Sequence, residues 1–249
     1  MATADLVYLA LIVVALAVDH LVFWPRFLRN AQVQPERARL RLWWAWMGML
    51  WVLAAAGVAL WLGTSRSFEL LGLNFPTGWR FWASSGLVLV LAGLYLPTTT
   101  KISKVNSAQR TALRARFGSL VTMLPRTRGE LSWFVALSVT AGVCEEFVFR
   151  GYLIWVLHPF FGLYGAAVVS LLVFAAAHAY QGAGGALKSG LLGALLTAVV
   201  MVFGSLLPAI VLHALIDIAS GVVAWLVLRE VPGEHPALQI EGSMQQVQG

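Results

Sequence analysis

The stretch LSWFVALSVTAGVCEEFVFRGYLIWVL (residues 131–157) is 27 residues long and contains only three charged side chains. About 20 apolar residues in an α-helix cross the hydrocarbon core of a bilayer, so this stretch suits a tilted membrane-spanning helix. Its charges are Glu145, Glu146 and Arg150. Ionisable side chains at membrane depth cost several kcal/mol and mark functional sites. We therefore predict a transmembrane helix that carries part of a site.

Six further apolar segments indicate that the whole chain is built in this way. The 249 residues are 59% hydrophobic and 11% charged, with a single cysteine, which excludes an ordinary soluble domain, a disordered chain and a disulfide scaffold. None of the segments alternates with the period of two that a barrel strand requires. We predict an all-α polytopic membrane helix bundle of about seven transmembrane helices. It forms a single domain over residues 1–230, followed by a mobile polar tail over 231–249. The six segments are 6–24, 42–62, 80–96, 161–179, 187–203 and 206–228.

The basic residues indicate an orientation in the membrane. Of the 17 Lys and Arg residues, only Arg66 and Arg80 fall on one side of the predicted bundle, and Arg150 lies inside a segment. The rest lie on the opposite side, which the positive-inside rule makes cytoplasmic. The net charge of +6 therefore reflects topology rather than a nucleic-acid partner. The excess of arginine over lysine favours a bacterial source, so we expect an inner-membrane protein with its N-terminus outside and its C-terminus in the cytoplasm.

Helical spacing separates the two adjacent glutamates. Glu146 and Arg150 are i,i+4 and share a face, so Arg150 can neutralise Glu146 within one helix. Glu145 projects about 100° further around the helix and lacks that partner. Burial beside a second carboxylate favours the protonated form of one of the two, which suits a general base. Glu145 is the candidate base, while Glu146–Arg150 is either a positioning pair or a structural ion pair.

Two histidine motifs supply further acid–base groups. His178 closes one apolar segment beside a glycine-rich loop, and His213 lies i,i+4 from Asp217 in the last segment. No serine stands in a nucleophile elbow. Water activated by Glu145 and His178 is therefore the predicted attacking group, with His213 and Asp217 placed to stabilise an oxyanion. This arrangement suits peptide hydrolysis.

Three motifs in this order resemble the glutamic intramembrane protease family that includes the CAAX prenyl endopeptidases and their bacterial relatives (the CPBP, or Abi, family). That family carries E-E-x-x-x-R, F-x-x-x-H and H-x-x-x-N/D on successive membrane helices. The resemblance covers about residues 120–228. The matching positions here are Glu145-Glu146…Arg150, Phe174…His178 and His213…Asp217.

The resemblance implies an endopeptidase that needs no cofactor. Its substrate would be a membrane-anchored protein or peptide, cut near its C-terminus in CAAX-type or bacterial sorting and maturation processing. Glu145 would activate water with help from His178, and Glu146 with Arg150 would position Glu145. The expected partners are this substrate and the lipid bilayer, with no nucleic acid, and no oligomeric state is implied.

The last motif departs from many relatives, because Asp217 stands where they carry asparagine. The resemblance implies that His213 and this residue form the oxyanion side of the site. An ionised aspartate cannot donate a hydrogen bond as an amide does. Asp217 must therefore hold a proton or orient His213, and we favour the orienting role.

Three alternatives stay open. Two histidines and two glutamates are potential zinc ligands, although the H-E-x-x-H helix of metalloproteases is absent. A non-enzymatic immunity or scaffold protein on a protease-like fold is a second alternative. An ion or proton transporter is a third, although no inverted repeat is visible. The Asp19–His20 pair in the first segment is interpreted as interfacial or interhelical.

The predicted depths of the two acid–base groups conflict. A helix that starts at Glu130 places Glu145 about 22 Å from the cytoplasmic side. His178 lies only a few residues before a cytoplasmic loop. Either residues 124–136 lie partly at the interface, or the glycine-rich loop 182–185 dips into the bundle.

Overall fold

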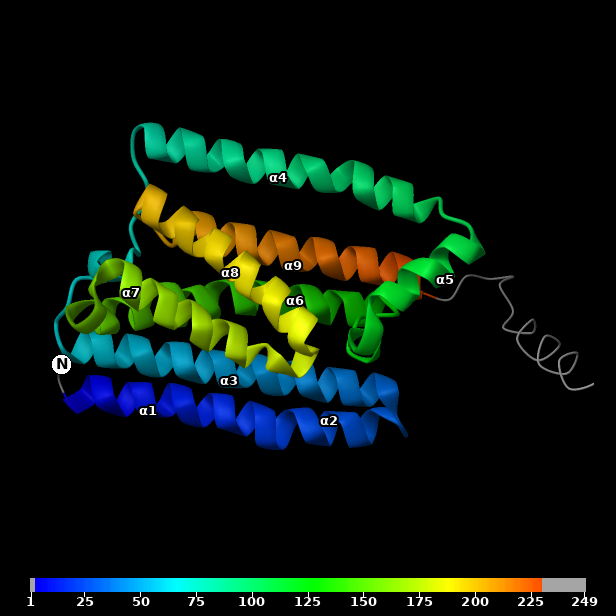
Figure 1. The fold of residues 1–249 in the computed structure, drawn as a ribbon, viewed down its shortest axis with the longest axis horizontal. Coiled ribbons are helices and arrows are strands. Elements are labelled where there is room, and N and C mark those ends of the chain that lie inside the picture. The colour runs from blue at the N-terminus through cyan, green and yellow to red at the C-terminus, as the bar shows by residue number, and fades with distance from the viewer. Residues whose placement is uncertain (1–2, 230–249) are drawn as a thin grey trace, which may run out of the picture.

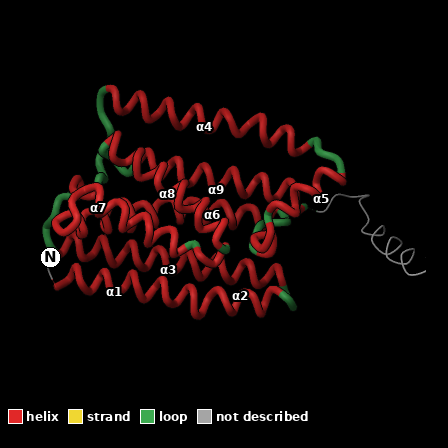
Figure 2. The backbone as a smooth tube through the Cα atoms, in the orientation of Figure 1, coloured by secondary structure: helices red, strands yellow, loops and turns green. Residues whose placement is uncertain are grey.

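The computed structural model describes residues 3–229, and all regular secondary structure in that range is helical, which confirms the predicted all-α bundle (Figures 1 and 2). The predicted tail over 231–249 lies outside the described residues. Short π-helical or 3₁₀ segments, labelled η, join or interrupt several α-helices. In chain order the elements are α1 (Thr3–Val18), η1 (Asp19–Phe23), α2 (Trp24–Ala31), α3 (Pro35–Gly63), η2 (Phe68–Leu71), α4 (Trp79–Ser103), α5 (Ser107–Arg116), η3 (Gly118–Thr122), α6 (Arg128–Glu145), η4 (Glu146–Leu153), α7 (Ile154–Ala177), η5 (Ala179–Gln181), α8 (Ala183–Phe203) and α9 (Leu207–Leu228).

Within the described range, six helical stretches are long and apolar enough to cross a membrane. One of them, Arg128–Ala177, is 50 residues long and contains the predicted segment 131–157 and all but the last two residues of 161–179. The chain turns inside it at Gly162, whose φ of 65° lies in the left-handed region that favours glycine. The seven predicted segments therefore all correspond to helical structure, two of them within one continuous stretch.

Helix α6 lies at the centre of the bundle, against α3 on one side and α9 on the other (Figure 1). Gly142 permits the close approach to α9. A Cβ atom at this position would lie 2.9 Å from the Ile210 carbonyl oxygen and 3.0 Å from the Ala214 Cβ atom. The two backbones can therefore pack closely one turn before the glutamates at the end of α6.

The turn between α7 and α8 lies inside the length of the bundle and stops short of the end where α5 lies (Figure 1). Tyr180 in this turn packs against Trp46 in the interior of α3, with ring centroids 5.3 Å apart. The conflict between the predicted depths is resolved in this way. Residues 183–185 of the predicted glycine-rich loop instead form the first turn of α8. The short turn over residues 179–182 lies inside the bundle, and it brings His178 to the cavity that Glu145 also lines.

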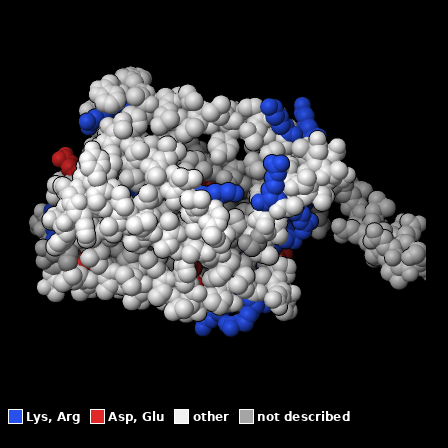
Figure 3. Space-filling model, in the orientation of Figure 1, with Lys and Arg blue, Asp and Glu red and all other residues white. Residues whose placement is uncertain are grey.

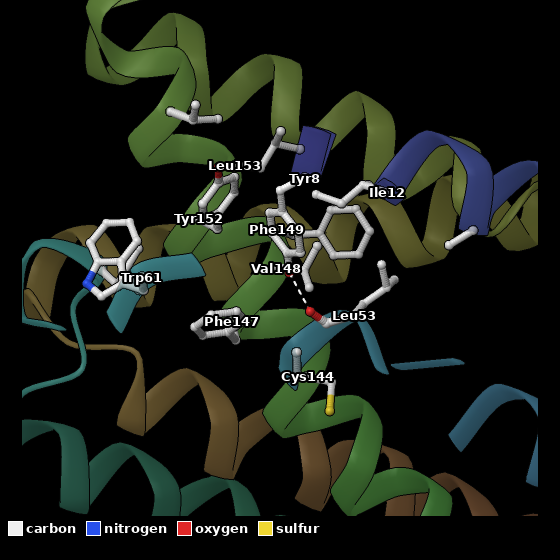
Figure 4. Packing of buried hydrophobic residues seen from close by; sticks show 14 of the residues in the cluster. Tyr8, Ile12, Leu53, Trp61, Cys144, Phe147, Val148, Phe149, Tyr152 and Leu153 are labelled. Atoms are coloured by element: carbon white, nitrogen blue, oxygen red, sulfur yellow. Dashed lines mark hydrogen bonds between the residues drawn. The ribbon is translucent and has the colours of Figure 1, made fainter. Parts of the chain in front are cut away.

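The N-terminal helix packs against α3 and η4 through a buried apolar cluster (Figure 4). The Tyr8 hydroxyl donates a hydrogen bond of 2.8 Å to the Leu53 carbonyl oxygen. Asp5, in the first turn of α1, is 1% exposed. Its Oδ1 atom accepts hydrogen bonds from Arg66 Nη1 at 2.7 Å and from the Tyr152 hydroxyl at 2.9 Å. Helix α1 is thereby tied to the segment that carries Glu146.

The outer surface of the bundle is apolar, as expected where lipid replaces water. Most of the Lys and Arg side chains visible in Figure 3 gather at the α5 end, and much of the remaining surface is uncharged. Large apolar side chains are exposed along several helices. Examples are Leu6, Val13, Leu89, Leu94, Val168, Leu172 and Leu191.

At the α5 end, a buried ion pair joins the start of α6 to α3. Glu130 is 2% exposed, and its Oε1 atom accepts hydrogen bonds from Arg39 Nε at 2.7 Å and Nη2 at 2.5 Å. Its Oε2 atom accepts from the backbone amides of Arg126 and Thr127, and the Thr127 hydroxyl accepts from the Glu130 amide. These contacts form a capping box that sets where α6 begins.

Replacing Glu130 with alanine is expected to lower the free energy of unfolding by roughly 3–5 kcal/mol, because Arg39 stays buried without its partner. Unfolding of the purified variant in detergent measures this loss. Glu36→Ala, at an exposed position near the start of α3, is the matched control, and its expected change is below about 0.5 kcal/mol. Equal stability of the two variants would show that the pair does not anchor α6.

Candidate active site

The two adjacent glutamates lie where α6 changes from an α-helix to the π-helical segment η4. Glu145 is the last residue of α6, and Glu146 is the first residue of η4. All eight residues of η4 are buried. π-Helical turns are rare, and they frequently lie at functional sites because they change which side chains face inward.

Glu146 is fully buried and accepts two hydrogen bonds at one oxygen atom. Its Oε1 atom lies 2.9 Å from Arg150 Nη1 and 2.8 Å from His213 Nδ1. The contact predicted between Glu146 and Arg150 is therefore present, although it forms across a π-helical rather than an α-helical turn. Because Glu146 bonds to both Arg150 and His213, it links η4 to α9.

Arg150 is held from three directions. Besides its contact with Glu146, its Nε atom donates to the Thr197 hydroxyl at 3.4 Å, and its guanidinium lies 4.1 Å from the ring centroid of Phe174. The Thr197 hydroxyl in turn donates to the Gly193 carbonyl oxygen at 2.8 Å. Sequence reasoning did not single out Thr197, since a threonine in an apolar helix gives no signal of its partner.

His213 is 3% exposed and has carboxylates near both ring nitrogens. Nδ1 bonds to Glu146, while Nε2 lies 3.7 Å from Asp217 Oδ2 and 3.9 Å from Glu145 Oε2. The hydrogen bond that orients this ring is therefore made by Glu146. Asp217 is nearby but beyond hydrogen-bond distance, and its side chain is 34% exposed.

His178 is the C-cap residue of α7, and one of its ring nitrogens bonds to the backbone of that helix. Its Nδ1 atom lies 2.9 Å from the Phe174 carbonyl oxygen, a partner that requires a hydrogen on Nδ1. In the neutral ring, Nε2 is then free to accept a proton. The ring lies between Phe174 and Tyr180, with centroid distances of 4.5 and 6.1 Å.

A cavity of about 350 Å³ brings the acid–base groups together. Four of the six predicted residues line it, namely Glu145, His178, His213 and Asp217. Glu146 and Arg150 do not line the cavity, but Glu146 bonds to both Arg150 and His213. The other walls are mainly apolar side chains, among them Ile12, Leu16, Leu50, Leu53, Leu120 and Met123.

Glu145 lines this cavity, and none of the residues that the structure describes donates a hydrogen bond to it. Its Oε2 atom is buried and has no hydrogen-bond partner among residues 3–229. Such an atom is free to bind a water molecule or a substrate group. Asp19 of η1 also lines the cavity, and the sequence had indicated only a polar pair in the first segment.

The described residues show no group of three or more His, Cys, Asp or Glu side chains arranged to hold a metal ion. Chelation therefore tests the zinc alternative.

Comparison with protein families identifies a relative of part of the chain. Residues 127–219 match the model for the type II CAAX prenyl endopeptidase Rce1-like family, a family of proteases. This confirms the family resemblance predicted from the motifs, and the matched residues include all six predicted site residues. Searches of curated proteins and of solved structures give no match to this chain.

Proposed function

We propose that this chain, whose residues 127–219 form an Rce1-like domain, is a glutamate-dependent intramembrane endopeptidase. One observation carries the proposal. Glu145, His178, His213 and Asp217 come from three separate helical elements and line one cavity inside a membrane-spanning bundle. Acid–base groups that converge on one mostly apolar cavity are typical of an active site.

In the proposed reaction, Glu145 takes a proton from water while the water oxygen adds to the carbonyl carbon of the scissile bond. The carbonyl oxygen becomes an oxyanion, and a protonated His213 donates to it from Nε2, while Nδ1 donates to Glu146. The C–N bond then breaks, and the proton passes through His178 to the leaving amide nitrogen. Water thus supplies a hydroxyl to the acyl product and a hydrogen to the amine.

The proposed substrate is a membrane-held protein or peptide, cut near its C-terminus. The apolar side chains contributed by α1, α3 and η3 can bury an apolar substrate segment beside the acid–base groups. We place the basic α5 end in the cytoplasm of a bacterial inner membrane, following the positive-inside rule.

The purified protein is expected to cleave at least one member of a panel of membrane-anchored C-terminal peptides, with a rate unchanged by a strong chelator. The reason is that a carboxylate rather than a metal activates water in the proposed mechanism. Product mass by mass spectrometry identifies the bond that is cut. Activity lost to the chelator and restored by zinc would replace this mechanism with a metal-dependent one.

A further inference from the structure

Asp19 is a carboxylate in the first apolar helix, far from the matched residues 127–219. It begins the π-helical segment η1, and its side chain is only 9% exposed. Pro25 lacks the amide hydrogen that a regular α-helix would donate to the carbonyl of residue 21. The pattern of backbone hydrogen bonds therefore changes at this point. A buried charge at a π-helical turn is costly, which favours a functional role.

The contacts of Asp19 direct it toward the candidate active site. Its Oδ1 atom accepts a hydrogen bond of 2.6 Å from Trp46 Nε1, while its Oδ2 atom lies 3.9 Å from His20 Nδ1. The side chain lines the same cavity as Glu145 and His178. The carboxylate is therefore held by its hydrogen bond to Trp46 and faces the cavity.

An aromatic cluster connects this carboxylate to the turn that carries His178. Tyr180 packs against Trp24 and Trp46, with centroid distances of 4.9 and 5.3 Å. On its other side, Tyr180 stacks with the ring of His178 at 6.1 Å. Burial raises the pKa of the Tyr180 phenol, so this ring stays neutral and acts through packing. Helices α2 and α3 therefore help to hold His178 in place.

We propose that Asp19 is a positioning residue for His178, supplied by the part of the chain that precedes the Rce1-like domain. It acts through its charge and through its hydrogen bond to Trp46, which steadies the aromatic cluster behind that ring. The inference rests on the function proposed above, in which His178 carries a proton to the leaving nitrogen. Asp19 exchanges no proton in that step, and its negative charge stabilises the transient imidazolium.

Besides Asp19, two acidic side chains and a second histidine line the same cavity as His178. Glu145 approaches from α6, and Asp217 and His213 approach from α9. Glu145 and His213 have roles of their own in the proposed reaction, and the Asp217 side chain is one-third exposed. Asp19 is the buried carboxylate on this side of the cavity that the proposed reaction leaves without a role.

The test compares Asp19→Asn with Trp46→Phe and with the control His20→Asn. Asparagine keeps the acceptor for Trp46 but removes the charge, whereas Trp46→Phe keeps the charge and removes the indole donor. His20→Asn changes the neighbouring, part-exposed residue outside the cavity lining. Histidine-selective ¹⁵N spectra of the resting protein, with the His178 signal assigned from His178→Gln, report the protonated fraction of His178 without substrate.

In Asp19→Asn, a smaller fraction of His178 is expected to be protonated at a given pH, and kcat is expected to fall about three- to tenfold with KM within about twofold. Trp46→Phe should change the protonated fraction and kcat less than Asp19→Asn does. His20→Asn should change neither quantity. In a His178→Gln background, Asp19→Asn should cause no further loss, because the two residues act through one another.

An unchanged protonated fraction in Asp19→Asn would overturn the inference, whatever the activity. A rise in KM with unchanged kcat would also overturn it, because Asp19 would then contact substrate rather than position His178. A changed protonated fraction in a protein that cleaves no peptide would uphold the coupling of Asp19 to His178 and contradict the proposed protease function instead.

Discussion

Replacing Glu145 with glutamine is expected to lower kcat for cleavage of a membrane-anchored peptide by about 10²–10⁴-fold. Glutamine has nearly the same size but cannot take a proton from water. The buried Oε2 atom of Glu145 has no hydrogen-bond partner among the described residues, so the change breaks no hydrogen bond at that oxygen. The unfolding temperature should therefore stay close to that of the unmodified protein.

Initial rates of product formation, measured by mass spectrometry in detergent and in vesicles, provide the measurement. The matched control is Glu69→Gln, which makes the same change at an exposed position in η2 and should leave the rate unchanged. A Glu145→Gln variant that cleaves at the unmodified rate would remove Glu145 from the mechanism. A cellular role that survives this substitution without proteolysis would support a scaffold protein on a protease-like fold.

Replacing Glu146 with leucine should both destabilise the protein and abolish cleavage. Arg150 would be left buried without its counter-charge, which is expected to cost roughly 3–5 kcal/mol of unfolding free energy. His213 would also lose the 2.8 Å hydrogen bond that orients its ring. Unfolding in detergent and peptide cleavage measure the two effects separately.

The double substitution Glu146→Leu with Arg150→Leu separates stability from chemistry. Removing both charges avoids the unpaired guanidinium, so much of the lost stability should return. Cleavage should stay absent, because His213 still lacks its partner. Recovered activity in this double variant would show that the pair is structural only, which was the other interpretation that the spacing allowed.

The membrane bundle and the contact between Glu146 and Arg150 were predictable from the chain because their signals are local. Segments of about 20 apolar residues predict spanning helices whatever their neighbours are. Ionisable side chains at membrane depth stand out against such segments, and i,i+4 spacing predicts the contact between Glu146 and Arg150. The order of the three motifs predicts a resemblance to the family, and residues 127–219 match the Rce1-like family model.

The roles within the cluster depend on contacts between distant segments. His213 and Asp217 are i,i+4 neighbours, and the sequence favoured Asp217 as the group that orients His213. The orienting bond instead reaches across the bundle to Glu146, because the close packing of α6 on α9 brings these side chains together. The sequence pattern of one helix does not indicate how a neighbouring helix is rotated about its own axis, so it cannot predict which side chains of the two helices meet.

Sequence alone therefore establishes the fold class, the family motifs and the residues that carry charge into the membrane, since each depends on neighbours within a few turns. The tertiary structure adds the depth of the α7–α8 turn, which places His178 beside Glu145, and the part played by Asp19 in lining the cavity. Both arise from packing between helices separated by more than 100 residues, and such packing depends on shape and on long-range contacts that no local pattern encodes.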